Sequence, residues 1–150
     1  MKSIMKPPNL ESIFHHEIPI TQGLDLKVLS IEASQIEMSF GLKANRNHKG
    51  TAFGGSQYNA CVLACYGLFL VGIREMGYAT NNIVVSEGLI KYRRPVEHDF
   101  VVIAKWDEAP RNDFFAGLKR KGKAKVSLQA QVYSQGASCT EFTGQFVALL

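Results

Sequence analysis

The sequence predicts a single α+β domain, residues 1–150, in which an antiparallel sheet wraps around one long buried helix. Three observations predict this class. One long segment is apolar on nearly every side of a helix, the other apolar segments mostly alternate with polar residues as strands do, and the order lacks the β-α-β alternation of a parallel sheet. A chain of 150 residues with 46% hydrophobic and 20% charged residues is long enough for one domain with a substantial core.

The first part of the chain predicts a short helix and two strands. Residues 9–17 have an amphipathic pattern that starts at Asn9 as an N-cap and is ended by Pro19. Two strand-like segments follow at 26–33 and 36–42, and the second alternates apolar and polar residues strictly, which indicates one buried face.

The long helix is predicted from Ser56, a natural N-cap, to about Glu75. Because it has no polar face, it must be surrounded by protein. Its most apolar part, residues 60–73, is shorter than a bilayer requires, so we expect no membrane span.

The second half is predicted to be almost entirely strand. A hairpin turn at 134–138 joins the last two strands, and a loop is expected at 107–117. The four predicted strands are residues 82–92, 100–106, 125–133 and 139–150.

A glycine-rich turn precedes the long helix and is the place where we expect the chemistry. Gly50, Gly54 and Gly55 permit positive φ and close approach of a ligand to the backbone. The first free N–H groups of the helix point into the same space with a partial positive charge, which suits a developing oxyanion. A phosphate-binding loop is excluded because the required Gly-Lys-Ser/Thr is missing, and a simple tight turn is the alternative.

The order of elements, the Asn47 to Gly55 turn and the segment Ile90–Val96 (Ile-Lys-Tyr-Arg-Arg-Pro-Val) resemble the hotdog-fold acyl-thioesterases. More narrowly, the chain is similar to the thioesterase domain found alone or fused behind a GNAT acetyltransferase domain in bacteria. The resemblance extends from about Leu10 to Leu150.

This resemblance implies a homodimer whose sheets join edge to edge, often paired again into a homotetramer, with active sites shared between the chains. By that pattern Asn47 would orient the attacking water or the thioester, and the Gly55 N–H would polarise the thioester carbonyl. Glu87, or Ser86 beside it, would come from the partner chain. The alternation along 82–92 predicts that Glu87 shares a face with Ile83 and Val85, and that Ser86 and Gly88 lie on the opposite face.

The sequence departs from the pattern of this family at two places. Phe53 stands where many relatives have a histidine, and Val62 stands where they have a helix acid. In the dehydratase branch a loop histidine pairs with a helix acid, and counting from His48 also leads to Val62. Two alternatives to hydrolysis therefore remain, a protein that binds acyl-CoA without hydrolysing it and a hotdog dehydratase or hydratase.

His48 is the candidate general base and Glu87 the available carboxylate; the alternatives are a solvated loop residue and a surface charge. Further residues are predicted to contact substrate, although core or interface packing explains Tyr58 and Asn59 equally well. These residues are Phe53, Gly54, Ser56, Tyr58 and Asn59.

The net charge of +4 comes with two basic segments, residues 119–125 and 91–94. We expect Lys121 and Arg93 to hold the phosphates of coenzyme A or the acidic surface of an acyl carrier protein. A solvated lysine-rich turn is the alternative. A nucleic-acid partner is not expected, because RNA-binding aromatic motifs and a helix-turn-helix pattern are missing from the sequence.

Cys61, Cys65 and Cys139 are expected to be reduced and to act as small hydrophobic residues, Cys61 and Cys65 one helical turn apart on the same face. The sequence also lacks a cluster with metal-ligand spacing and a secretory signal, so we expect no metal, no cofactor, no membrane partner and a cytoplasmic location.

Overall fold

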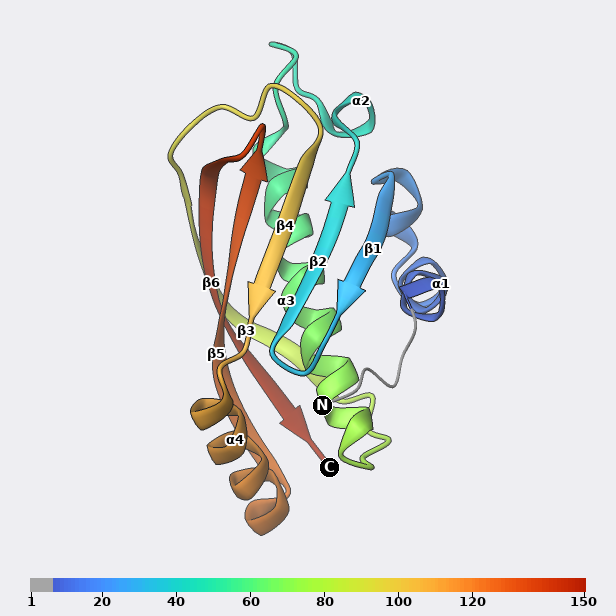
Figure 1. The fold of residues 1–150 in the computed structure, drawn as a ribbon. Helices are drawn as coiled ribbons and strands as arrows, with labels where there is room; N and C mark the ends of the chain where they lie inside the picture. The colour runs from blue at the N-terminus through green and yellow to red at the C-terminus, as the bar shows by residue number, and fades with distance from the viewer. Residues whose placement is uncertain (1–6) are drawn as a thin grey trace.

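A six-stranded antiparallel sheet wraps around a long helix in the computed structural model, which describes residues 7–150 (Figure 1). The predicted class is therefore confirmed. In chain order the elements are α1 (Pro7–Glu17), a 3-10 helix η1 (Pro19–Gly23), β1 (Leu26–Ile31), β2 (Gln35–Phe40), α2 (Leu42–Asn45), α3 (Gly54–Glu75), β3 (Ile83–Tyr92), β4 (Phe100–Lys105), α4 (Glu108–Lys121), β5 (Lys123–Ser134) and β6 (Ala137–Leu149).

The strands lie in the order β1-β2-β4-β5-β6-β3, so β1 and β3 form the two edges. The edge at β1 is covered by α1, and the backbone N–H of Val28 donates to the Glu11 carboxylate at 2.7 Å. The edge at β3 is uncovered within the described chain, and its apolar side chains Val84, Val85 and Leu89 are exposed. One edge of the sheet is therefore covered by a helix, and the other is exposed.

Helix α3 runs along the inner face of the sheet and is buried on most sides. At 22 residues it is long and apolar enough to cross a membrane, but 72% of its most apolar window is buried inside the protein. Phe69 of α3 packs against Trp106, Phe114 and Phe146 from other elements. This packing identifies α3 as the core helix of the domain.

Helix α4 occupies the segment that the sequence predicted to be a loop, so that prediction is wrong. Phe114, Phe115 and Leu118 are buried on one side of the helix, and the two phenylalanines pack against Trp106. The helix ends at Gly122, whose φ of 70° is the left-handed conformation typical of a C-terminal cap. Burial of one short apolar face, rather than helix propensity, stabilises α4.

A β-bulge at Ser86 interrupts the alternation along β3. Val85 registers with Phe146 and Glu87 with Gln145, which leaves Ser86 as the extra residue. From that point the faces exchange, so Gly88 faces α3 while Glu87 faces outward. The prediction that Glu87 shares a face with Ile83 and Val85 is therefore wrong.

The turn between β5 and β6 is confirmed as a tight hairpin, in which Gln135 and Gly136 both have positive φ, 53° and 76°. Two predicted helix starts shift by two residues. Helix α1 begins at Pro7 instead of Asn9, and α3 begins at Gly54 instead of Ser56.

Candidate functional site

The loop before α3 is a small hairpin that Asn47 holds together. Its ends are joined by a bridge between Arg46 and Ala52. The Asn47 side-chain oxygen accepts hydrogen bonds from the backbone N–H of Lys49 and Thr51, and its amide nitrogen donates to the Thr51 hydroxyl. The Asn47 side chain is therefore engaged in shaping the loop.

Backbone hydrogen bonds at the end of the loop fix the position at which α3 begins. The N–H of Ala52 donates to the carbonyl of Val96, and the N–H of Phe53 donates to that of Asn45. Asn45 is itself buried and donates from its side chain to the carbonyls of Leu24 and Gly41. Residues from three parts of the chain thus fix where the helix begins.

The first turn of α3 offers free backbone donors. Phe53 is the N-cap, its side chain makes no capping bond, and its carbonyl accepts from Gln57. The N–H groups of Gly54, Gly55 and Ser56 precede the first intrahelical donor and remain available. Together with the helix dipole they form a positive site suited to an anion or an oxyanion.

Gly54 and Gly55 do not have positive φ, so it is close packing against neighbouring side chains that restricts these two positions. A Cβ added at Gly55 would lie 2.5 Å from the ring of Phe53, and one at Gly54 would lie 3.2 Å from the hydroxyl of Tyr92. The predicted positive φ holds for Gly50, at 80°, and is wrong for Gly54 and Gly55. Small residues here keep the helix N-terminus open between two aromatic rings.

Tyr92 and Gln57 are important residues at this site that the sequence analysis missed. The Tyr92 hydroxyl donates to the Gly54 carbonyl at 2.8 Å. Partial burial raises the pKa of Tyr92, with smaller contributions from Cys61 and Tyr58. Gln57 is buried in the first turn of α3, where its amide donates to the Ala52 carbonyl at 3.1 Å and its oxygen accepts from the Thr140 hydroxyl.

A groove of about 290 Å³ lies in front of the helix N-terminus. It runs between the start of α3 and the segment that leaves β3, and among the residues with free helix donors Gly54 lines it. Its lining residues are Ala52, Gly54, Gln57, Tyr92, Arg93, Arg94 and Pro95.

Tyr58 and Asn59 continue the site along α3. The Tyr58 ring packs edge-on against Phe142, and its hydroxyl occupies the space that a side chain at Gly88 would fill. Asn59 and Val62 are partly exposed on the side of α3 that the sheet leaves open. Val62, at the position of the expected acid, is therefore an apolar residue on an accessible stripe of the helix.

The two predicted ionisable residues lie in different places. His48 is exposed in the hairpin loop before α3, on the same segment as the helix N-terminus. Glu87 is exposed on the outer face of β3, so the sheet separates its side chain from the inner face along which α3 runs. Ser86 lies at the bulge, where its hydroxyl donates to the Gln145 carbonyl at 3.4 Å.

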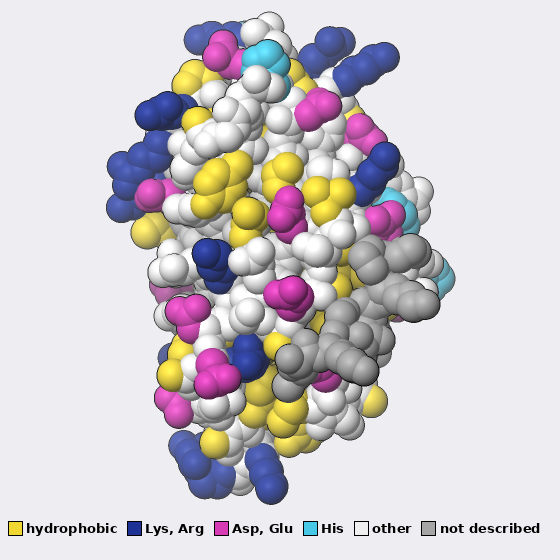
Figure 2. All heavy atoms as spheres, viewed as in Figure 1, with side chains coloured by type: hydrophobic (Ala, Val, Ile, Leu, Met, Phe, Trp, Pro, Cys, Tyr) yellow, Lys and Arg dark blue, Asp and Glu magenta, His cyan; other side chains and the backbone are white. Residues whose placement is uncertain are grey.

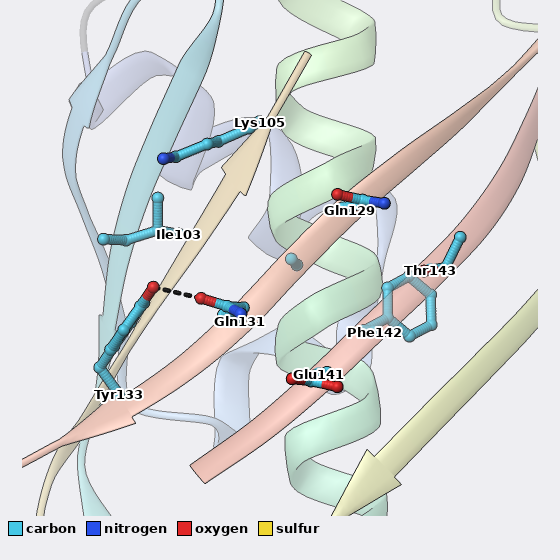
Figure 3. A pocket seen from close by; sticks show the side chains of 9 residues that line it. Ile103, Lys105, Gln129, Gln131, Tyr133, Glu141, Phe142 and Thr143 are labelled. Carbon is cyan, nitrogen blue, oxygen red and sulfur yellow. Dashed lines mark hydrogen bonds between the residues drawn. The ribbon is translucent and has the colours of Figure 1, made fainter. Parts of the chain in front are cut away.

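Arg93 lines the groove but is already paired. Its guanidinium donates to the Glu141 carboxylate at 3.0 and 3.2 Å, the one ion pair found among residues 7–150. Glu141 also lines a polar hollow of about 390 Å³ on the outer face of the sheet (Figure 3). Because this hollow and α3 lie on opposite sides of the sheet, it is separate from the groove.

Lys121 and the three cysteines do not form a further catalytic or metal site beside the groove. Lys121 is exposed at the end of α4. The three cysteines are buried and unpaired, and burial raises the pKa of the Cys61 thiol to about 12 and that of Cys65 well above its ordinary value. In the described part of the chain, His, Cys, Asp and Glu side chains do not cluster in a way that would hold a metal ion.

Comparison with known proteins gives the family. The family model described as "Putative thioesterase (yiiD_Cterm)" matches residues 8–150. The structure is similar to that of a protein of unknown function from Chlorobaculum tepidum TLS, at 35% identity, a TM-score of 0.88 and coverage of 95% of this chain and 93% of that chain.

Two further structures carry thioesterase descriptions. The first, described as a putative thioesterase, is from Shewanella oneidensis, with 26% identity, a TM-score of 0.86 and coverage of 95% and 96%. The second, PA5026 from Pseudomonas aeruginosa, is described as a probable thioesterase and shares the fold, with 21% identity, a TM-score of 0.82 and coverage of 99% of both chains. The chain has the hotdog fold and belongs to the yiiD C-terminal family of thioesterases.

Proposed function

We propose that the protein hydrolyses an acyl thioester, carried by coenzyme A or by an acyl carrier protein, to the free acid and the thiol. The observation that carries this proposal is the uncapped N-terminus of α3 in a chain of a thioesterase family: the free donors of Gly54, Gly55 and Ser56 lie beside a groove that Gly54 lines. The groove supplies access and the donors supply charge stabilisation.

The reaction needs donors placed where negative charge develops. With the thioester carbonyl oxygen at the Gly55 N–H, attack by water on the carbonyl carbon gives a tetrahedral oxyanion that the helix N-terminus stabilises. The carbon–sulfur bond then breaks, the thiolate leaves and takes up a proton, and the acid remains. Removal of one such donor typically costs about 100- to 1,000-fold in kcat.

His48 is the residue that we propose as the proton acceptor. It lies on the loop that leads into the helix N-terminus, and its side chain is exposed. Asn47 acts in this proposal by holding the loop and, through it, His48. Glu87 remains the second candidate, although its outward direction on β3 makes it the weaker one.

We also propose that the active protein is a homodimer, and in a further step a homotetramer. An exposed edge strand with apolar side chains is a template for pairing, and β3 is such an edge. The partly exposed stripe on α3 lies on the side that a second copy would cover. The three buried, unpaired thiols fit a reducing compartment, which supports a cytoplasmic location.

A second candidate function is favoured by one observation, the apolar Val62 at the position of the expected helix acid. Without an acid the same site would bind acyl-CoA without turnover. A dehydratase is disfavoured, because that chemistry pairs the loop histidine with the missing acid.

One assay separates hydrolysis from binding. Release of free thiol is measured with acyl-CoAs of increasing chain length, for the natural protein and for Gly55→Val, which forces a side chain against the Phe53 ring. Gly23→Val is the matched control, because a Cβ there meets nothing within 4 Å.

Hydrolysis by the natural protein and by Gly23→Val, and its loss in Gly55→Val, would support the proposal. Retention of acyl-CoA in equilibrium dialysis without thiol release would support the binding function instead. Activity of Gly55→Val at the natural rate would contradict the assignment of the oxyanion site.

A further inference from the structure

The peptide unit between Gly54 and Gly55 has a hydrogen-bonded oxygen at one end and the proposed oxyanion donor at the other. Its carbonyl oxygen, on Gly54, accepts the hydrogen bond from the Tyr92 hydroxyl at 2.8 Å. Its N–H, on Gly55, is the donor that the proposed function places at the thioester carbonyl. Because a trans peptide unit is planar, its C=O and N–H bonds point in opposite directions. A bond that holds the oxygen therefore also sets the direction of the N–H.

The helix itself does not account for the bond from Tyr92. In the regular helical pattern the Gly54 carbonyl accepts from the N–H of Tyr58, four residues along the chain. A carbonyl oxygen has two lone pairs, so the Tyr92 hydroxyl adds a second bond to the same oxygen. Hydrogen bonds in series polarise one another, and the added bond makes the N–H of this peptide unit a stronger donor.

Tyr92 reaches the helix N-terminus from another part of the fold. It is the last residue of β3, where it registers with Thr140 of β6, and it lines the groove in front of α3. A Cβ added at Gly54 would lie 3.2 Å from the Tyr92 hydroxyl. A glycine at position 54 therefore leaves the hydroxyl free to approach the carbonyl closely.

The Tyr92 hydroxyl is kept in the protonated form that can donate. Partial burial raises its pKa, and Cys61 and Tyr58 of α3 raise it further. The cationic residues Arg93 and Arg94 line the same groove. Since the ordinary tyrosine pKa is already about 10, the hydroxyl keeps its proton and donates at neutral pH.

We propose that Tyr92 is a positioning residue for thioester hydrolysis, and that its hydroxyl orients and polarises the peptide unit whose Gly55 N–H stabilises the oxyanion. This inference rests on the proposed function and deepens it. The N–H acts more strongly on the oxyanion than on the bound carbonyl, because the oxygen carries more negative charge in the transition state. Loss of the hydroxyl should therefore lower kcat and leave KM nearly unchanged.

The first experiment measures thiol release by Tyr92→Phe with the acyl-CoA that the natural protein hydrolyses fastest. We expect kcat to fall about tenfold, less than for loss of the whole donor, and KM to change less than about twofold. Tyr133→Phe is the matched control, because it also removes a tyrosine hydroxyl that donates, in this case to Gln131. Tyr133 lies on the outer face of the sheet, away from α3 (Figure 3), where acidic, basic and hydrophobic side chains are interspersed (Figure 2).

This experiment can overturn the inference in three ways. An unchanged kcat in Tyr92→Phe would show that the hydroxyl does not assist the donor. An equal fall in Tyr133→Phe would show that loss of any such hydroxyl bond has the same effect. A raised KM with unchanged kcat would show that Tyr92 binds the substrate directly instead of acting through the peptide unit.

The second experiment changes the acidity of the hydroxyl and keeps the ring. The analogue 3,5-difluorotyrosine, whose hydroxyl ionises at a lower pH than that of tyrosine, is incorporated at position 92 alone. An ionised hydroxyl cannot donate to the Gly54 carbonyl. The ratio of kcat between the fluorinated and the natural protein should therefore fall as the pH rises through the pKa of the fluorinated hydroxyl, which its absorbance reports. A ratio that stays constant through that pKa would overturn the inference.

The third experiment requires no turnover. The amide 1H and 15N NMR signals of Gly55 are compared in the natural protein, Tyr92→Phe and Tyr133→Phe. Weaker polarisation of the peptide unit should move these signals upfield in Tyr92→Phe alone. Unchanged Gly55 signals would overturn the inference even in an active enzyme. If the natural protein hydrolyses no acyl thioester, the proposed function fails, and this shift alone decides whether Tyr92 polarises the peptide unit.

Discussion

The buried bond between Thr140 and Gln57 predicts a loss of both stability and activity when Thr140 is replaced by valine. Valine has the shape of threonine without the hydroxyl, so the change leaves the Gln57 oxygen buried without a donor. An unpaired buried acceptor costs about 1–3 kcal/mol, and each kcal/mol lowers Tm by about 2–4 °C in a chain of this size. We expect Tm to fall by roughly 6 °C.

Activity should fall as well, because Gln57 also holds the Ala52 carbonyl and so fixes the start of α3. A small displacement of the oxyanion donors should lower kcat about tenfold. Tm is measured by scanning calorimetry at one protein concentration, since a dimer melts in a concentration-dependent way. Thiol release from acyl-CoA gives kcat.

Two controls make this prediction specific. Thr143→Val changes an exposed threonine on the outer face of the same strand and should alter neither quantity. Thr140→Ser keeps the hydroxyl and should lose less stability than the valine variant. A Tm for Thr140→Val within about 1 °C of the natural value would refute the energetic argument, and a lower Tm with unchanged kcat would refute the positioning role of Gln57.

Three further predictions follow from other parts of the structure. If His48 accepts the proton, His48→Ala should lower kcat about 100-fold in the thiol-release assay, the typical contribution of a general base; an inactive Glu87→Gln together with a fully active His48→Ala would reverse the assignment. If the proposed homodimer forms through β3, Leu89→Lys should give the mass of a monomer in light scattering, whereas Leu29→Lys, on the edge covered by α1, should leave the mass unchanged. Burial raises the pKa of Cys61 from 9.0 to about 12, so a thiol reagent at pH 8 should modify Cys61 only in denaturant, and rapid labelling of the folded protein would contradict this. The stability that the buried, protonated Cys61 thiol contributes should be complete below pH 9 and should be lost as the pH rises toward 12.

The sheet and α3 could be predicted from the sequence because their signal is periodic. Strict alternation along β2 and β5 and the apolar character of α3 are properties of many residues at once, so no single exception obscures them. Helix α4 gives a weaker signal. The residues Pro110 and Gly117 and the closing lysines are typical of a loop. The segment is helical because Leu118 is buried and because Phe114 and Phe115 pack against Trp106.

The site was predicted less completely, because its details depend on contacts between distant residues. The oxyanion position could be predicted, since glycines before an apolar helix are visible in sequence. The bulge at Ser86 could not be predicted, because it is a property of the register between β3 and β6, and it turned Glu87 outward. The roles of Tyr92 and Gln57 depend on partners 38 and 83 residues away along the chain.

The covered edge at β1 and the exposed edge at β3 suggest a link between assembly of the protein and catalysis. At one edge a whole helix covers β1, and a glutamate on that helix accepts from an edge N–H group, while at the other edge β3 leaves its backbone groups and apolar side chains uncovered. In the proposed homodimer the open edge is the interface for the second copy. Because β3 ends beside the α3 groove, pairing there would bring the second copy next to the proposed catalytic site. If that pairing is needed for catalysis, disrupting β3 should abolish activity even where every proposed catalytic residue is intact.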